Sequence, residues 1–316
     1  MRFFVLFIGF CWFYWDVFSQ DSLLKMLPDG DYAKGEPVIA SFKTTRLINA
    51  HSIEVVRRGQ LDFRITHRFG DAAGSYGGPN TFFGFDNSTD IRIALEYGIS
   101  DRFCAGFGRS KFNQLLDGYL KYRVFRQTMD NKVPVSVTVL ANTGFSTTPK
   151  DPHNFPKYIH RFSYFFETLI ARKFSNRLSV QIAPAWLYRN YIYDTEDSKS
   201  LISIGLGLRF KITKRFVVVA DYYHLFSSFR NSKKDALGNK QYYPPFGLGL
   251  EFETGGHIFS VNFTNAPAIV ENSYLAYTQS NWLRGQFRFG FNISRQFSLI
   301  KQQKPTPETT SSSSHF

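Results

Sequence analysis

A histidine and a serine near the C-terminal end of the chain are the first residues whose types could do chemistry. The stretch HIFSVNF places His257 three positions before Ser260. A serine nucleophile needs a histidine base within hydrogen-bonding reach. Along a β-strand, residues three positions apart point to opposite faces. The spacing therefore disfavours a hydrolase on this strand, and we expect no catalytic residue and no enzyme activity.

Histidine and cysteine spacing also disfavours a metal or cofactor site. No pair of histidines has the H-x-x-x-H or H-E-x-x-H spacing, and the two cysteines, Cys11 and Cys104, are far apart. Zinc and haem sites built on such residues need close, defined spacings. We therefore expect no metal ligands and no cofactor.

The elements that must position the polar side chains are long alternating strands. In QLDFRITHRF, Leu61, Phe63 and Ile65 share one face, and Asp62 and Arg64 share the other. The alternating segments are roughly 9–13 residues long, whereas soluble strands usually have about 5–6 and membrane strands about 9–11. Aromatic residues make up 18% of the chain and concentrate on the apolar face, as in barrel girdles. Membrane strands are thus favoured over a soluble sandwich.

The connections between these segments alternate in length. The long ones cover 70–87, 144–159, 189–198, 227–244 and 265–280, with a shorter one at 110–115. The short ones fall at about 100, 127–132, 173–176, 212–214 and 254–255. Short periplasmic turns and longer extracellular loops are typical of outer-membrane barrels. The pattern predicts an all-β fold, a transmembrane antiparallel up-and-down β-barrel of about twelve strands over residues 60–300, with its last strand at 281–293 and both termini periplasmic.

A repeated phrase predicts three of the short turns. GISDRF, KFSNRL and KITKRF each place three polar residues between two apolar ones, as a three-residue hairpin loop would. NISRQF at 292–297 repeats the phrase, so the chain from Phe297 either forms a short turned-back end or begins a further strand. In the second case a segment near 38–56 would also join, which gives a barrel of fourteen strands. The predicted periplasmic turn residues are Ser100, Asp101, Arg102, Ser175, Asn176, Arg177, Thr213, Lys214 and Arg215.

The two ends of the chain lie outside the predicted barrel. Residues 1–19 have an arginine, an apolar run and small residues at a cleavage site, which indicates a signal peptide. Residues 20–59 are a periplasmic or lumen-associated segment, and the Ser/Thr-rich stretch 301–316 is a flexible periplasmic tail.

The polar faces of the strands point into the predicted lumen, where acids and bases nearly balance. Such charges are expected to pair, because unpaired charges in a confined space are costly. Glycines on the same faces, such as Gly207 and Gly247, favour open volume or a tucked-in segment, although strand curvature also explains them. The predicted lumen-lining charges are Asp62, Arg64, Arg68, Asp90, Arg92, Glu96, Arg102, Asp117, Lys121, Arg123, Glu167, Arg209, Asp221, Glu251, Glu253, Arg284 and Arg288.

Several phrases resemble a known family. HRFG at 67–70, EYGISDRF at 96–103 and FGFNISR at 289–295 are the most specific, and the resemblance spans about residues 38–300. The family is a group of Bacteroidota outer-membrane β-barrels known only as a domain of unknown function. The resemblance implies a signal peptide, a barrel and the outer membrane of a Gram-negative bacterium, and it carries over no activity or ligand.

Two functions follow from these features. The favoured function is a narrow pore or transporter for small solutes, with paired charges lining its lumen. In the alternative, the charges lock the lumen, and the barrel is a non-conducting structural protein or a subunit of an envelope complex. The formal net charge of +13 is scattered through connecting segments. It suits anionic lipid better than nucleic acid, so the expected partners are outer-membrane lipid, lipopolysaccharide and an unidentified envelope protein.

Overall fold

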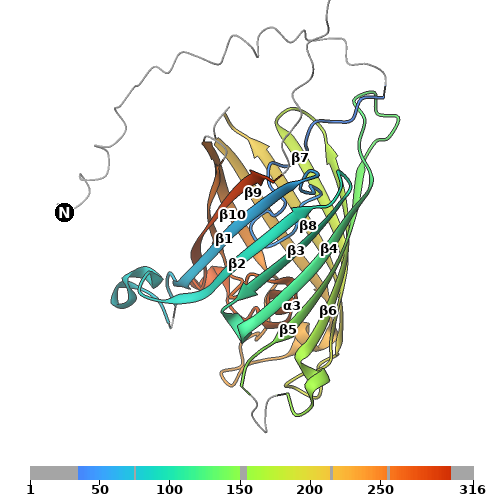
Figure 1. The fold of residues 1–316 in the computed structure, drawn as a ribbon. Helices are drawn as coiled ribbons and strands as arrows, with labels where there is room; N and C mark the ends of the chain where they lie inside the picture. The colour runs from blue at the N-terminus through green and yellow to red at the C-terminus, as the bar shows by residue number, and fades with distance from the viewer. Residues whose placement is uncertain (1–34, 75, 150–154, 214–215, 255–256, 300–316) are drawn as a thin grey trace, which may run out of the picture.

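The computed structural model describes residues 35–74, 76–149, 155–213, 216–254 and 257–299. Within these residues, twelve antiparallel strands follow one another around a closed barrel, and the first strand pairs with the last (Figure 1). Closure leaves no unpaired edge, which hydrocarbon would not tolerate. The predicted fold class is thereby confirmed.

The strands are 8–12 residues long, and helical segments occur in the connections between them. The strands are β1 Gln60–Asp71, β2 Ser88–Gly98, β3 Phe103–Ser110, β4 Leu115–Phe125, β5 Ser136–Ser146, β6 Phe162–Lys173, β7 Leu178–Arg189, β8 Ser200–Lys211, β9 Phe216–Phe226, β10 Phe246–Thr254, β11 His257–Thr264 and β12 Arg288–Ser298. The helices are η1 Pro79–Gly84, η2 Phe112–Gln114, η3 Tyr158–Arg161, α2 Ser228–Ser232, α3 Glu271–Tyr277 and η4 Trp282–Arg284.

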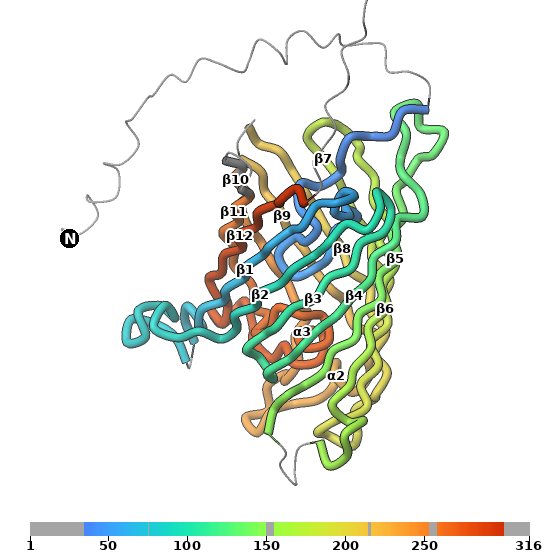
Figure 2. The backbone as a smooth tube through the Cα atoms, viewed as in Figure 1, coloured from blue at the N-terminus to red at the C-terminus, as the bar shows by residue number. Residues whose placement is uncertain are grey.

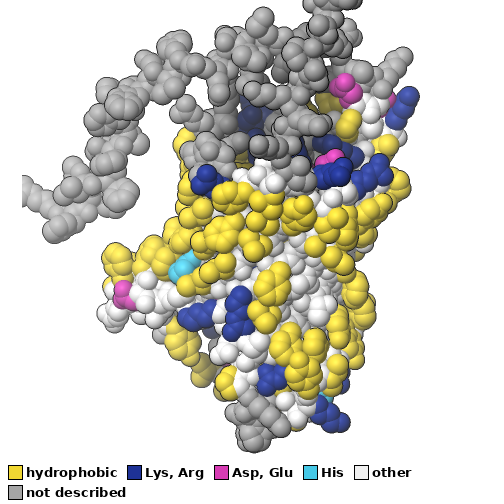
Figure 3. Space-filling model, in the orientation of Figure 1, with side chains coloured by type: hydrophobic (Ala, Val, Ile, Leu, Met, Phe, Trp, Pro, Cys, Tyr) yellow, Lys and Arg dark blue, Asp and Glu magenta, His cyan; other side chains and the backbone are white. Residues whose placement is uncertain are grey.

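The two faces of the wall differ in chemistry. Apolar side chains such as Ile93, Phe107 and Leu120 are exposed on the outside, while Asp90 and Arg92 on the neighbouring inward positions are buried. In the view of Figure 3, apolar atoms cover much of the outer wall. Lipid is the solvent such a face requires. No helix among the described residues is long and apolar enough to cross a membrane.

The short turns join strands at one end of the barrel, here called the short-turn end. In three of them the apolar residues that flank the turn are bonded through their backbones, at 3.0 Å for Ile99 to Phe103 and 2.9 Å for Phe174 to Leu178. The first polar residue of each turn accepts a backbone N–H, as Ser100 does from Phe103 at 3.1 Å. Lys214 and Arg215 lie outside the described residues.

The last strand is displaced from its predicted position. The prediction was 281–293, but β12 covers Arg288–Ser298. The phrase NISRQF is not a turn, because Ile293 pairs with Ile65 and Phe297 pairs with Leu61 across the seam that closes the barrel. Residues 282–284 instead form η4, which ends at Gly285 in the left-handed conformation with φ 73°.

Of residues 35–59, the part of the chain before β1 that the structure describes, most lie inside the barrel. The chain passes along the connection between β4 and β5, where the Val38 N–H donates to Gln127 at 2.8 Å, and then turns into the lumen (Figure 2). Phe42, Leu47 and Ile53 pack there in one apolar core with residues of the wall and α3. Residues 38–56 therefore form no fourteenth strand. The predicted signal peptide and tail lie outside the described residues.

Candidate functional site

The first segment inside the lumen is a tight hairpin, residues 41–56, here called the inner hairpin. It enters from the short-turn end, and its two arms are bridged between Arg46 and His51. Backbone bonds close the turn, with Leu47 donating to Ala50 at 2.8 Å and Ser52 donating to Thr45 at 2.9 Å. Nearly all of its residues are buried, so the hairpin is part of the barrel interior.

One carboxylate on the wall holds the tip of the inner hairpin. Asp221 of β9 accepts the backbone N–H groups of Ile48 at 2.9 Å, Asn49 at 2.6 Å and Ala50 at 3.0 Å. It also accepts the Asn49 side-chain amide at 2.6 Å. A tight turn leaves these donors without partners in its own backbone, and bonds to a charged acceptor are strong. Asp221 therefore fixes where the tip lies.

The second segment inside the lumen is residues 265–278, here called the inner loop. It connects β11 to β12 from the opposite end of the barrel and contains α3 (Figure 1). Arg68 of the wall donates to the carbonyls of Ala266 and Ala268, and Asp90 accepts the Ile269 N–H at 2.9 Å. The same Arg68 donates to the Asn49 side chain at 2.7 Å. One arginine thus binds both inner segments.

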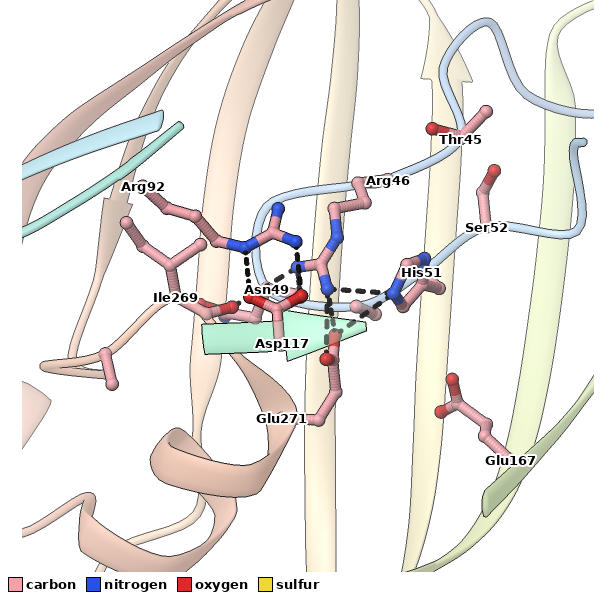
Figure 4. Close-up of polar contacts among 12 residues, drawn as sticks. Thr45, Arg46, Asn49, His51, Ser52, Arg92, Asp117, Glu167, Ile269 and Glu271 are labelled. Atoms are coloured by element: carbon pink, nitrogen blue, oxygen red, sulfur yellow. Dashed lines mark hydrogen bonds and ion pairs between the residues drawn. The ribbon is translucent and has the colours of Figure 1, made fainter. Parts of the chain in front are cut away.

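The two inner segments also meet directly. Arg46 donates to the two carboxylate oxygens of Glu271 at 2.7 and 3.0 Å, and both side chains are buried (Figure 4). Arg46 also lies 2.8 Å from His51 Nε2. Because a guanidinium can only donate, His51 Nε2 must accept, which makes the ring neutral with its proton on Nδ1. Burial, followed by the positive charge of Arg46, lowers the pKa of His51 well below its ordinary value.

Some charges of the wall pair with each other, as expected. Arg92 of β2 donates to Asp117 of β4 at 2.9 and 2.5 Å (Figure 4), and Arg64 lies 3.2 Å from Asp62. Others bind the inner hairpin instead. The Lys121 ammonium donates to three of its carbonyls, at 3.3 Å for Thr45, 3.1 Å for Ser52 and 2.5 Å for Glu54.

The structure brings most of the predicted lumen residues into the barrel interior. Arg123 is partly buried and lies 3.1 Å from Glu54. Those that are buried are Asp62, Arg64, Arg68, Asp90, Arg92, Glu96, Asp117, Lys121, Glu167, Arg209, Asp221, Glu251 and Arg288.

Two predicted lumen residues do not line the lumen. Arg102 is exposed in its turn, and Arg284 is exposed in η4, where it bonds Asn239 at 2.6 Å. Both were assigned by extending the alternation of a strand past its true end, where side chains no longer alternate between faces. The Glu253 side chain lies outside the described residues.

The prediction of lumen-lining residues from the sequence did not include any residue of the two inner segments. Arg46, His51, Glu54 and Glu271 lie in stretches without a strand period, so nothing assigned them to a face. One signal was present, because Ala266, Ala268, Ile269 and Val270 make the inner loop too apolar for a long loop in water.

Buried polar side chains of the wall face the two inner segments. Ser260 is buried and faces inward from β11. In the described part of the chain, no group of three or more histidine, cysteine, aspartate or glutamate side chains is placed to hold a metal ion. In this site, buried charged side chains of the wall form hydrogen bonds with backbone groups of the two inner segments.

The sequence profile of one protein family matches residues 42–297, described as Membrane bound beta barrel domain (DUF5777). The chain belongs to this family. The matched range begins at the second residue of the inner hairpin and ends one residue before the end of β12, so it covers nearly all of the barrel and of both inner segments.

Comparison with solved structures finds other barrels. The NanC porin is 12% identical with a TM-score of 0.46, covering 75% of this chain and 98% of its own. The KdgM porin is 7% identical with a TM-score of 0.43, covering 76% and 99%. Omp33 of Acinetobacter baumannii is 8% identical with a TM-score of 0.39, covering 76% and 99%. No curated protein matches the chain in sequence. These similarities carry no information on what this family member does.

Proposed function

We propose that this protein is an outer-membrane barrel whose lumen is closed in its ground state, and that it acts as a non-conducting scaffold or subunit of the cell envelope. The observation that carries the proposal is the buried contact between Arg46 and Glu271, which joins an inner segment from each end of the barrel. In this proposal the short turns and both termini face the periplasm, the long loops face outward, and lipopolysaccharide surrounds the wall.

The width of the barrel supports closure. Eight-stranded barrels are filled by their own side chains, and those of sixteen or more leave a channel. Here two segments of the chain supply the additional filling. The glycines on the inner wall accommodate them, since a Cβ at Gly207 would lie 2.7 Å from Leu47 and one at Gly247 would lie 2.7 Å from Ile48.

The energetics of the contacts also support closure. Withdrawal of the inner hairpin would leave Asp221 and Lys121 without the backbone groups that now bind them. Water in the opened lumen would replace these bonds, and a hydrogen bond to a charged group is worth about 1.5–3 kcal/mol net in such an exchange. Spontaneous opening is therefore expected to be rare.

A narrow pore for small solutes is the second candidate. It is favoured by the polar character of the wall behind the inner hairpin, where Arg64, Asp221 and Glu251 would line an opened lumen. Such a pore would need a trigger that displaces the hairpin, because the ground state is filled.

Liposome swelling separates the two candidates. Wild-type barrels are reconstituted and exposed to gradients of small sugars and amino acids, and the heat-modifiable gel shift confirms folding. We expect no swelling above protein-free liposomes. Swelling with folded wild type, without any added trigger, would establish the pore and overturn the closed scaffold. Recovery of a stoichiometric envelope protein with the barrel from native membranes would support the subunit role.

A further inference from the structure

A cavity of about 510 Å³ lies at the long-loop end of the barrel, outside the closed lumen. It is bounded by the end of β7, the connection 190–199, α2, the connection 233–245 and the end of α3. Its volume falls within the ~300–1,000 Å³ of small-molecule sites. Tyr277 of its lining belongs to the inner loop, and the other lining residues lie outside both inner segments.

The lining of the cavity is polar and aromatic, with no aliphatic side chain among the residues that form it. Tyr193, Tyr242 and Tyr277 contribute rings, and Gln241 and Gln279 contribute amides. A tyrosine offers an apolar ring face together with a hydroxyl, and an amide both donates and accepts. This combination suits a ligand that has apolar C–H faces and many hydroxyl groups.

The formal charges around the cavity cancel. Two arginines, Arg189 and Arg230, and two aspartates, Asp194 and Asp197, belong to the lining. Arg189 and Arg230 donate to the same oxygen of Asp197, at 2.9 and 2.6 Å. Lys233 lies 2.7 Å from Asp194 and 3.2 Å from Glu196. The charged groups are thus already engaged with one another, which favours a neutral ligand over an ion.

The same contacts hold the cavity in shape. Arg230 is buried, donates to the Ala276 carbonyl at 2.6 Å, and places its guanidinium 4.3 Å from the centre of the Tyr242 ring. The Tyr243 N–H donates to Thr278 at 3.0 Å. Because these bonds join α2, the 233–245 connection and α3 before any ligand arrives, little ordering remains for binding to oppose.

We propose that this cavity binds a neutral saccharide, with tyrosine rings against its C–H faces and the two glutamines bonding its hydroxyls. Tyr193 is the best placed ring, because it lies in the lining, is 54% exposed and packs edge-on against Tyr277 at 6.3 Å. The proposal goes beyond the proposed function and holds whether or not the lumen conducts. Conductance and saccharide binding are measured separately, so either idea can fail alone.

Titration calorimetry on the full-length folded barrel tests the proposal. The detergent must be an amine oxide, because alkyl glycosides present sugars. The probes are neutral trisaccharides (maltotriose, cellotriose, xylotriose and tri-N-acetylchitotriose), with trigalacturonate as the anionic comparison. We expect at least one neutral probe to bind with a Kd of about 1 mM or tighter, and trigalacturonate to bind more weakly.

Variants at the cavity assign the binding to it. Tyr193→Ala and Gln279→Ala should each weaken binding by about tenfold, while Tyr193→Phe, which keeps the ring, should stay within about threefold. Tyr76→Ala is the matched control, because Tyr76 is 80% exposed in the connection between β1 and β2. No binding by any neutral probe, tighter binding of trigalacturonate, or unchanged binding in folded Tyr193→Ala and Gln279→Ala would each overturn the proposal.

Discussion

Arg46 and Glu271 lie 225 positions apart in the chain, and their side chains meet at 2.7 Å in the interior of the barrel. Arg46 belongs to the inner hairpin, and Glu271 is the first residue of α3 in the inner loop. Both side chains are buried, with 5% and 0% of their surface exposed. The pair therefore connects the segment that enters from one end of the barrel to the segment that enters from the other.

Replacing both Arg46 and Glu271 should lower the free energy of unfolding by clearly less than the sum of the two single replacements. Arg46→Met or Glu271→Gln alone is expected to destabilise the barrel by about 3–5 kcal/mol, since each leaves a buried charge or donor unmatched. The double variant should cost clearly less than the sum. A double-mutant cycle from urea unfolding measures the coupling. Lys132→Met is the control, because Lys132 is 76% exposed and 3.9 Å from Asp130, and it should change little. Additive single costs would contradict the coupling of the segments.

Loss of the Asp221 charge should loosen the tip of the inner hairpin. An asparagine presents one oxygen to donors that now share two, so Asp221→Asn is expected to cost about 1.5–3 kcal/mol locally. Hydrogen exchange followed by mass spectrometry should show faster exchange for residues 46–52. Asp235→Asn, an exposed residue that also accepts backbone N–H groups in a loop, should leave that peptide unchanged. Equal protection in both variants would mean that the carboxylate does not hold the tip.

Acid should weaken the packing around His51. Its pKa is lowered in the folded protein, so below the ordinary value of about 6.5 the unfolded chain binds a proton that the folded chain does not. The stability present above about pH 6.5 is then lost as the pH falls, with a slope of up to about 1.4 kcal/mol per pH unit. His51→Gln keeps an acceptor for Arg46 and has no proton to take up. It should match wild type at pH 8 and lose less stability by pH 5.5, and identical pH profiles would refute this.

The inner-wall glycines give a steric prediction. A Cβ at Gly247 would lie 2.7 Å from Ile48, 2.8 Å from Asn49 and 2.9 Å from Asp221. Gly247→Ala should therefore displace the hairpin tip and cost about 1–3 kcal/mol. At Gly118 the nearest atom to an added Cβ is 4.0 Å away, so Gly118→Ala is the matched control with little effect. Urea unfolding of both variants tests this, and equal stability would indicate a loosely packed hairpin.

The barrel was largely predictable from the sequence because its strands and tight turns are each encoded by residues close together in the chain. Alternation defines each strand, and three polar residues between apolar ones define a tight turn, as at Ser100 and Ser175. The last strand was misplaced because Leu283, Arg284, Gln286 and Phe287 extend the apolar and polar alternation of β12 into a segment that is not a strand. An alternation of polar and apolar residues shows which face of the sheet a side chain occupies only where the chain is an extended strand.

The filled lumen was predictable only in part. Gly207 and Gly247 suggested a tucked-in segment, and Leu47 and Ile48 occupy the space beside them. The partners of Arg46 and Asp221 could not be foreseen, because these contacts join residues 225 and about 170 positions apart. Contacts of that kind depend on how the closed barrel places its interior, and no local pattern encodes them.

Single-channel recording in planar bilayers tests the closed lumen most directly. Folded wild-type barrels should show no conductance steps above the background of the lipid. Asp221→Asn should show brief openings, because the hairpin tip is then less strongly held, and Asp235→Asn should be silent. A steady conductance through wild-type barrels, equal to that of Asp221→Asn, would contradict a lumen closed by the two inner segments.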